Sequence, residues 1–216
     1  MNCIVLADQP TKGIKSKGWN GLIPVNKKHN LIQNQINVIR SHFPKSKIIY
    51  IYGFDHRKVE CYFSRTSVEV SNFVYLRNNK FIESGDGYAV SMTHEFLDKE
   101  CLFFYGGMVL QPSMFKNFEK NKSQIYTSNK DYNELGCVVN QEGNVEHVCY
   151  GLENYVGELY YVSKKDIDNF RAIATNHDYR NYFLFEMINK AIESGSKFKE
   201  VNINRKNTFK TVLQQK

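Results

Sequence analysis

The stretch NCIVLA, residues Asn2–Ala7, decides the fold class, because it is an apolar run of strand length that opens a strand–helix–strand unit. Such runs are typical of parallel strands that are buried on both faces of a sheet. After a polar stretch with several glycines, Asn30 stands where it can cap a helix over Leu31–Phe43, whose apolar residues recur every three or four positions. A second β-rich run follows at Lys47–Gly53, so this part of the chain predicts two parallel strands joined by a helix.

Strands and helices continue to alternate beyond this unit. The pattern predicts further strands at 68–76, 101–105, 123–128, 135–140, 144–148, 155–162 and 198–203. It predicts helices at 55–63, 88–97 and 112–121, a helix capped by Ser163, and a helix at 179–194 with Phe183 facing inward. This alternation indicates an α/β fold with a mainly parallel sheet. We expect one domain over residues 1–204 and a polar tail over 205–216.

The composition is that of a globular protein with a basic surface. The chain of 216 residues carries a net charge of +7, which favours anionic partners. Its lysines are spread out and no RNA-recognition or zinc-finger pattern occurs, so nucleic acid is not an expected partner. No apolar run approaches the ~20 residues of a membrane span, and the amino terminus lacks the pattern of a secretory signal. The five cysteines include no C-x-x-C pair, which indicates reduced thiols and a cytoplasmic protein.

Several motifs occur in the order known from one enzyme family. Ile4–Ala7 is the first strand, Leu22–Val25 (LIPV) follows the first loop, and Lys47–Gly53 is the second strand. Tyr182–Gly195 (YFLFEMINKAIESG) is similar to the closing helix of that family. The chain thus resembles the nucleoside-diphospho-sugar nucleotidyltransferases of GT-A-like fold, in their choline-phosphate cytidylyltransferase-like and glucose-phosphate thymidylyltransferase-like branch. The resemblance implies a Rossmann-like α/β sandwich with a mostly parallel central sheet flanked by helices.

The resemblance also implies a reaction, the transfer of a nucleotidyl group to a phosphate. Such a transfer needs backbone N–H donors, cationic side chains and a carboxylate-held Mg²⁺ ion, because dense negative charge develops on the phosphates. Where the family has its lysine this chain has Asn20, and where the family has a metal-binding aspartate it has Gly107. The phosphate loop contains Asp8 and Pro10, of which the first adds a negative charge and the second removes a donor. The stretch Arg205–Leu213 offers no second metal aspartate.

These replacements predict degenerate catalytic positions, no metal site and no cofactor, with Mg²⁺ required only if the chain is active. The remaining candidates for phosphate binding are Lys12, Gly13, Lys15, Lys17 and Lys27. The candidates for contacts with a base or sugar are Ser84, Gly85, Asp86, Glu158 and Glu186. Plainer interpretations are a solvated basic loop, a turn in which Asp86 caps a helix, and partly exposed charges. Trp19 could stack on a base or fill the emptied triphosphate site.

Two functions are compatible with these observations. One is a nucleotidyltransferase-fold protein that has lost metal-dependent transfer and serves a binding or structural role in an assembly, with the aromatic residues of 150–161 at an interface. The alternative is a divergent active nucleotidyltransferase that joins a nucleoside triphosphate to a sugar phosphate or a phosphorylated amino alcohol. A nucleotide or sugar phosphate is the expected ligand. A GT-A glycosyltransferase has less support, since the one D-x-D sequence, Asp166–Asp168, lies at a predicted helix start.

Overall fold

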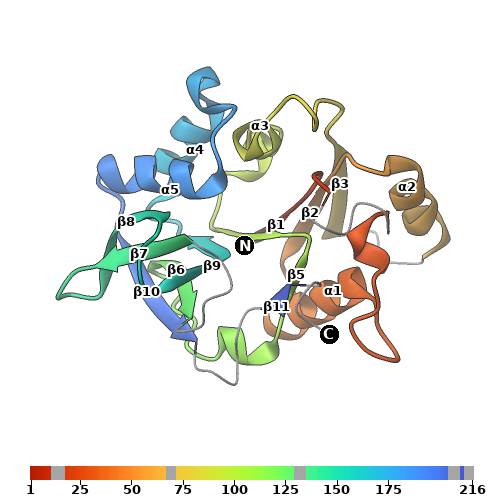
Figure 1. Cartoon of the computed structure of the whole chain (residues 1–216), viewed down its shortest axis with the longest axis horizontal. Helices are drawn as coiled ribbons and strands as arrows, with labels where there is room; N and C mark the ends of the chain where they lie inside the picture. Colours follow the sequence, from red (N-terminus) through yellow and green to blue (C-terminus); the bar gives the residue numbers. More distant parts are fainter. Residues whose placement is uncertain (11–17, 67–71, 129–134, 204–209, 212–216) are drawn as a thin grey trace.

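The computed structural model describes residues 1–10, 18–66, 72–128, 135–203 and 210–211, which form a large sheet with helices on both faces (Figure 1). The nine strands of this sheet follow the spatial order β3-β2-β1-β4-β9-β6-β10-β8-β7. Their bounds are β1 Asn2–Ala7, β2 Lys47–Tyr52, β3 Phe73–Arg77, β4 Cys101–Tyr105, β6 Ser123–Ser128, β7 Leu135–Val139, β8 Asn144–Tyr150, β9 Tyr155–Val162 and β10 Phe198–Ile203. A second small sheet pairs β5 (Met108–Val109) with β11 (Lys210–Thr211) in antiparallel fashion.

Strand directions make the first half of the large sheet parallel and the second half mixed. β3, β2, β1 and β4 are parallel neighbours. β9 runs against both β4 and β6, β10 is parallel to β6, and β8 runs against β10 and β7. Seven of the nine strands therefore point the same way, with β8 and β9 reversed. The expected α/β architecture with a mostly parallel central sheet is confirmed.

Two helical layers cover the sheet because the side chains of a strand point alternately to its two faces. The α-helices are α1 Leu31–His42, α2 His56–Arg65, α3 Asp86–Ser91, α4 Ile167–Thr175 and α5 Leu184–Glu193. Ile4 and Leu6 of β1 pack in one core with α3, α4 and α5, whereas Cys3 and Val5 pack in the other with α1 and α2. No helix within the described ranges is long and apolar enough to cross a membrane.

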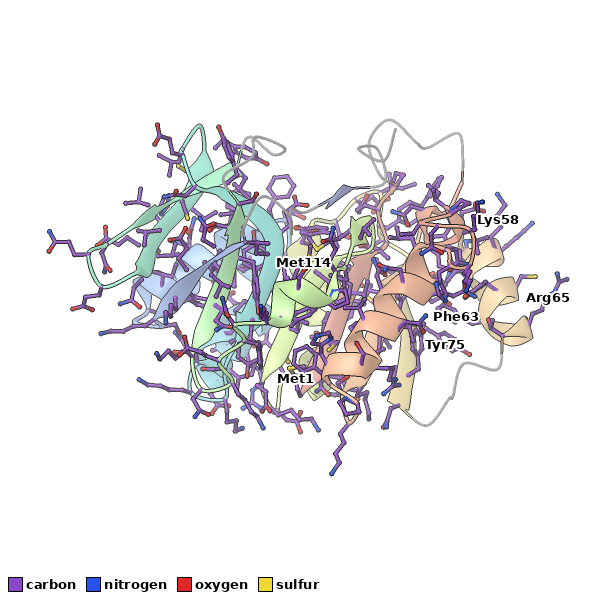
Figure 2. All side chains as sticks on the ribbon, turned by 90° about the horizontal axis from the view of Figure 1, so that it is seen from below. Met1, Lys58, Phe63, Arg65, Tyr75 and Met114 are labelled. Carbon is purple, nitrogen blue, oxygen red and sulfur yellow. The ribbon has the colours of Figure 1, made fainter. Side chains whose placement is uncertain are left out.

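The outer strand β3 is partly shielded by α2. The ring of Phe63 on α2 stacks on Tyr75 of β3 with their centroids 5.4 Å apart and an angle of 4° between the planes. Figure 2 shows these two side chains next to each other, with Lys58 and Arg65 farther out on the same helix. Tyr75 is nevertheless 52% exposed, so the edge of the sheet keeps an aromatic surface.

Most of the predicted elements are present, with differences at four helices. The helix predicted to be capped by Ser163 is α4, which has Asp166 at its N-cap, and the Ser163 hydroxyl donates to Asp166 Oδ2 at 3.1 Å. The segment predicted as a helix at 112–121 is a short 3-10 turn, η5 (Pro112–Phe115). The helix predicted at 88–97 is divided into α3 and a 3-10 turn, η4 (His94–Phe96). The helix predicted at 179–194 is preceded by a 3-10 turn, η6 (His177–Tyr179), and begins only at Leu184, so Phe183 lies outside it and is 52% exposed.

The late start of α5 has a physical cause in the neighbouring helix. The N–H groups of Gly87 and Tyr88 donate to the carbonyl oxygens of Tyr182 and Arg180, both at 2.9 Å. A Cβ atom on Gly87 would lie 1.9 Å from the carbonyl oxygen of Tyr179. The 179–182 segment is therefore bound to α3 through carbonyl groups that a continuous helix would need for its own hydrogen bonds.

The predicted polar tail over residues 205–216 lies mostly outside the described ranges. Residues 205–209 and 212–216 of the expected polar tail lie outside the described ranges. Lys210–Thr211 lies inside them, as strand β11 beside β5. The boundary at residue 204 stays a prediction.

Gly106 stands where the chain leaving β4 comes closest to the end of β1. Its N–H donates to the carbonyl oxygen of Leu6 at 2.7 Å. A Cβ atom here would lie 2.3 Å from Cβ of Ala7 and 2.9 Å from its Cα. Non-bonded carbon atoms prefer ~3.5–4.0 Å, so glycine alone fits without a shift of the backbone.

We expect Gly106→Ala to lower the free energy of unfolding by about 1–3 kcal/mol, because the added methyl group overpacks this contact. Adding Ala7→Gly to the same chain should recover part of the loss, since it removes the methyl group that the new side chain would meet. Urea unfolding followed by circular dichroism measures both variants, with Ala7→Gly alone as the control. Wild-type stability of G106A would contradict the close approach of the two strands.

Candidate functional site

Acidic side chains gather where β1 and β4 end, and the first of them is Asp8. Its side chain is buried and one carboxylate oxygen accepts a hydrogen bond from Asn78 Nδ2 at 2.7 Å. Its carbonyl oxygen accepts from the N–H of Phe54 at 2.8 Å. Because the carboxyl ends of parallel strands are where open α/β sheets bind ligands, this edge is the candidate functional site.

Asp86 lies beside this edge and connects three elements. It is the first residue of α3, yet its carboxylate oxygen Oδ2 accepts from the N–H of Leu184, the first residue of α5, at 3.0 Å. The same oxygen accepts from the hydroxyl of Tyr105 at the end of β4. The expectation that Asp86 caps its own helix is therefore wrong, because Gly85 is at the N-cap of α3 and the carboxylate serves α5 instead.

Glu158 reaches the same place from β9 through an irregular backbone. Ile125 of β6 pairs with Tyr160 and Thr127 with Val156, so β9 uses more residues than β6 over this span and forms a bulge. Glu158 lies in the bulge with φ of 56°, in the left-handed region that side chains other than glycine rarely adopt. Bulges and strained residues of this kind aim side chains at functional sites.

Burial raises the pKa of all three carboxyl groups, and the charge of Asp86 adds to the rise at Asp8 and at Glu158. Burial, with a contribution from Asp86, raises the pKa of Glu158 from 4.5 to about 7. Burial raises the pKa of Asp8 from 3.8 to about 6, against the hydrogen bond from Asn78, and Asp86 adds to the rise. Burial also raises the pKa of Asp86, against the hydrogen bond from Tyr105. Ionisation of Asp86 therefore opposes ionisation of Asp8 and of Glu158.

The other candidates for base or sugar contacts have local roles around Asp86. Glu186 accepts from the N–H of Phe183 at 2.7 Å and so caps α5, while its charge adds to the raised pKa of Asp86. Ser84 donates to the carbonyl oxygen of Lys80 at 2.8 Å, and a Cβ on Gly85 would lie 2.6 Å from the carbonyl oxygen of Asn181. The structure thus brings Asp86 and Glu158 together, with Glu186 near Asp86.

Trp19 and Asn20 lie elsewhere, in the layer under α2. Trp19 is 3% exposed, its Nε1–H donates to the hydroxyl of Tyr50 at 3.1 Å, and its ring packs edge-on against Tyr62 at 5.5 Å. It is a core residue, so the idea that it stacks on a base is wrong. Asn20 is buried in the turn η2 (Asn20–Leu22), where Gly21 fits tightly against the Trp19 ring.

The turn that carries Gly107 is fixed by α1. Gln35 is buried, and its amide Nε2 donates to the carbonyl oxygens of Gly106 at 3.1 Å and Met108 at 2.8 Å. Gly107 lies between these two anchored residues and brings no side-chain ligand atom.

Solved structures identify the architecture, although the chain matches no known protein-family model and no curated protein by sequence. CTP:phosphocholine cytidylyltransferase from Streptococcus pneumoniae has a TM-score of 0.78 and 15% identity over 98% of this chain and 92% of that chain. A putative glucose-1-phosphate thymidylyltransferase from Bacillus anthracis has a TM-score of 0.75 and 14% identity over 100% and 91%. The inositol-1-phosphate CTP transferase from T. maritima has a TM-score of 0.73 and 14% identity over 98% and 88%.

This chain has the nucleotidyltransferase fold. The expected resemblance is thereby confirmed at the level of fold, over nearly the whole chain. The carboxylate cluster of Asp8, Asp86 and Glu158 lies at the end of the sheet where open α/β folds bind their ligands.

The predicted phosphate-binding residues are mostly beyond the described part of the chain. Lys12, Gly13, Lys15 and Lys17 all lie in the undescribed segment 11–17. Lys27 is exposed in a turn whose backbone is fixed by Asn26, whose Oδ1 accepts from the N–H groups of Lys28 and His29 at 2.8 and 2.9 Å. The contacts within the described ranges do not bring Lys27 to the carboxylate cluster.

A Mg²⁺ ion does not fit the carboxylates that the structure describes. Oδ2 of Asp86 already accepts two hydrogen bonds, and one oxygen of Asp8 accepts another. Gly107 supplies no oxygen ligand from a side chain, and no three His, Cys, Asp or Glu side chains in the described ranges are placed to hold a metal ion. Since Mg²⁺ demands near-octahedral oxygen ligands, we derive no reaction step through it.

Aromatic side chains beside the cluster were not recognised as site residues from the sequence. The ring of Phe185 lies 5.6 Å from Tyr150 and 5.9 Å from Phe183. Of the aromatic residues expected at a protein interface, Tyr150 is 60% exposed, whereas Tyr160 and Tyr161 are buried in the core. Tyr160 and Tyr161 point to opposite faces of β9 and are buried in different cores, because helices cover both faces of the sheet. Nothing in the sequence shows that Tyr150 meets the start of α5.

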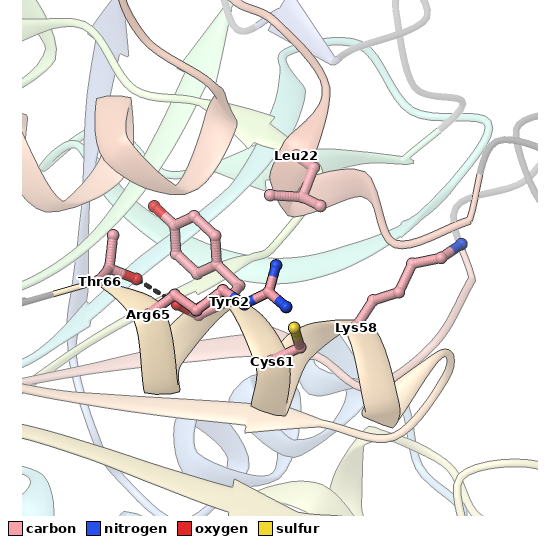
Figure 3. Close-up of a pocket in the computed structure, with 6 residues that line it drawn as sticks. All are labelled: Leu22, Lys58, Cys61, Tyr62, Arg65 and Thr66. Carbon is pink, nitrogen blue, oxygen red and sulfur yellow. Dashed lines mark hydrogen bonds between the residues drawn. The ribbon is translucent and has the colours of Figure 1, made fainter.

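A shallow pocket lies between η2 and α2 (Figure 3). Its volume is about 260 Å³ and it is lined by Leu22, Lys58, Cys61, Tyr62, Arg65 and Thr66. None of these residues belongs to the carboxylate cluster. The pocket is therefore not part of the candidate site.

We expect the stability of this protein to fall between pH 5 and pH 8 because Glu158 has a raised pKa in the folded state. A carboxyl group with a raised pKa stabilises the fold at low pH, and that contribution is lost as the pH rises through about 7. Glu158→Gln should remove about 2 kcal/mol of this loss. Urea unfolding at pH 5.5 and 8.5 measures the effect, with the exposed Glu146→Gln as control. An unchanged pH dependence in E158Q would contradict a raised pKa of the Glu158 carboxyl group.

Proposed function

We propose that this chain is a cytoplasmic binding protein of nucleotidyltransferase fold that holds a phosphorylated amino alcohol, free or joined to a nucleotide, without metal-dependent transfer. The observation that carries the proposal is the pair of carboxyl groups of Asp86 and Glu158. Both have raised pKa values, and the described residues supply no cationic partner for either. An ammonium group of a ligand would offset their mutual repulsion.

Exposed aromatic rings beside these carboxyl groups support a cationic ligand. Phe183 immediately precedes Leu184, whose N–H donates to Asp86. Tyr150 lies near the same groups, because burial chiefly raises the pKa of Tyr160 and Glu158, Asp86 and Tyr150 all add to that rise. Tyr150 and Phe183 are 60% and 52% exposed. A cation over such rings gains ~0.5–2 kcal/mol. One structural neighbour is a CTP:phosphocholine cytidylyltransferase, whose named substrate carries a quaternary ammonium group.

We propose the loss of nucleotidyl transfer because of the residues at two positions, Asn20 and Gly107, where the family has a lysine and an aspartate. Asn20 brings no charge where the family has a lysine, and it is buried in a turn rather than presented to a cleft. Gly107 brings no carboxylate, and Gln35 anchors the residues on both sides of it. Loss of one electrostatic contact of this kind costs ~10²–10³ in rate, so two losses together support a binding role.

Isothermal titration calorimetry tests the ligand class. We expect phosphocholine to bind more tightly than glucose 1-phosphate, because only phosphocholine brings a cation to Asp86 and Glu158. Glu158→Gln should weaken phosphocholine binding by about tenfold, or ~1.4 kcal/mol, and leave glucose 1-phosphate unchanged. Glu146→Gln is the matched control, since that side chain is exposed on β8. Equal affinities for the two phosphates would refute the proposal.

A divergent active enzyme is the second candidate, and Glu158 is the observation that favours it. A strained backbone and a raised pKa in one residue are typical of catalytic centres. This candidate requires release of pyrophosphate from CTP, or another nucleoside triphosphate, in the presence of phosphocholine and Mg²⁺. Release that Lys27→Ala abolishes, or tight Mg²⁺-dependent binding of the triphosphate, would overturn the proposed loss of transfer.

A further inference from the structure

Two cationic side chains converge on Tyr88 of α3, beside the carboxylate cluster. Lys80 Nζ lies 5.7 Å from the centre of the Tyr88 ring, and the guanidinium carbon of Arg180 lies 5.6 Å from it. The two residues come from different parts of the chain, the loop after β3 and the connection between α4 and α5. The ring therefore organises a pair of positive charges that the sequence separates by a hundred positions.

This pair carries charge that the described residues do not neutralise. Neither Lys80 nor Arg180 forms an ion pair there, and the guanidinium of Arg180 contacts His177 Nε2 at 2.9 Å. Each contact with the ring is worth only ~0.5–1 kcal/mol at an exposed site. Two positive charges without a carboxylate partner near one ring favour the binding of an anion.

Hydrogen bonds hold the backbone of both Lys80 and Arg180 in place. The N–H of Lys80 donates to Asn78 Oδ1 at 2.8 Å, and its carbonyl oxygen accepts from Ser84 Oγ at 2.8 Å. The carbonyl oxygen of Arg180 accepts from the N–H of Tyr88 at 2.9 Å. The backbone of both residues is therefore held by hydrogen bonds, which limits the positions that the two side chains can reach.

The pair also lies next to the candidate site. Asn78, which fixes Lys80, donates its side-chain N–H to Asp8 at 2.7 Å. Asp86 is two residues before Tyr88, and Leu184, its partner, is four residues after Arg180. The two cations therefore lie near the buried carboxyl groups of Asp8 and Asp86, around the start of α3.

We propose that Lys80 and Arg180 form a phosphate-binding site against Tyr88. A guanidinium group can bind two oxygens of one phosphate, and an ammonium group binds phosphate as a point charge. This site adds a phosphate-binding part to the proposed function. It rests on that function only for the identity of the molecule that carries the phosphate. In a phosphorylated amino alcohol the phosphate would bind Lys80 and Arg180, and the ammonium group would face Asp86 and Glu158.

Titration with inorganic pyrophosphate at low ionic strength tests the site without assuming the ligand. We expect Lys80→Ala and Arg180→Ala each to weaken binding by about tenfold, and the double variant to bind no better than the buffer control. Arg57→Ala is the matched control, because it removes one exposed cation from α2. Tyr88→Phe keeps the ring and should bind as the wild type does. Thermal unfolding of every variant by circular dichroism verifies the fold.

Two outcomes would overturn the site: no pyrophosphate binding by the wild type at millimolar concentration, or equal binding by the wild type and the double variant. Arg180→Lys distinguishes recognition of the phosphate by charge alone from recognition by two hydrogen bonds of the guanidinium group. It keeps the charge and loses the bidentate geometry, so an intermediate affinity is expected. If pyrophosphate binds through Lys80 and Arg180 while phosphocholine does not bind at all, the phosphate site stands and the proposed function fails.

Discussion

The hydrogen bonds of the Asp86 carboxylate are the interaction on which the rest of the site depends. One oxygen accepts from the first N–H of α5 and from the hydroxyl of Tyr105 at the end of β4, while the residue itself begins α3. A negative charge is favourable at the start of a helix, and here one carboxylate lies at the starts of two. The placement of α3, α5 and the end of β4 therefore depends on a single buried group.

The charge of Asp86 affects the carboxyl groups around it. The charge of Asp86 raises the pKa of both Asp8 and Glu158, and Glu158 approaches it only because β9 bulges. The opposite charges of Lys80 and Arg180 meet the ring of Tyr88, which is two residues after Asp86. A ligand with an ammonium group and a phosphate would complement both the carboxyl groups and the two cations, whereas the described residues place no three carboxylate, histidine or cysteine side chains to hold a metal ion.

The sequence predicted a substantial part of the site, but not the roles of its members. Asp86 and Glu158 were both expected to contact a base or sugar, and the structure brings them together. Asp86 was expected to cap its own helix, yet it caps α5, because a capping rule considers only neighbours along the chain. Trp19 had no periodic neighbours to show that it is buried against Tyr50 and Tyr62. Lys80, Arg180 and Tyr150 gave no local signal, since their importance lies in contacts across the fold.

By itself the sequence determined the order of strands and helices, the parallel first half of the sheet and the absence of a lysine and an aspartate at Asn20 and Gly107. Apolar periodicity and residue identity are local properties, so they can be read along the chain. Only the tertiary structure decided the late start of α5, the bulge at Glu158, the approach of Asp86 and Glu158, and the contacts of Lys80 and Arg180 with the Tyr88 ring. These features arise from hydrogen bonds, close packing and charge between residues far apart in sequence, which no local pattern encodes.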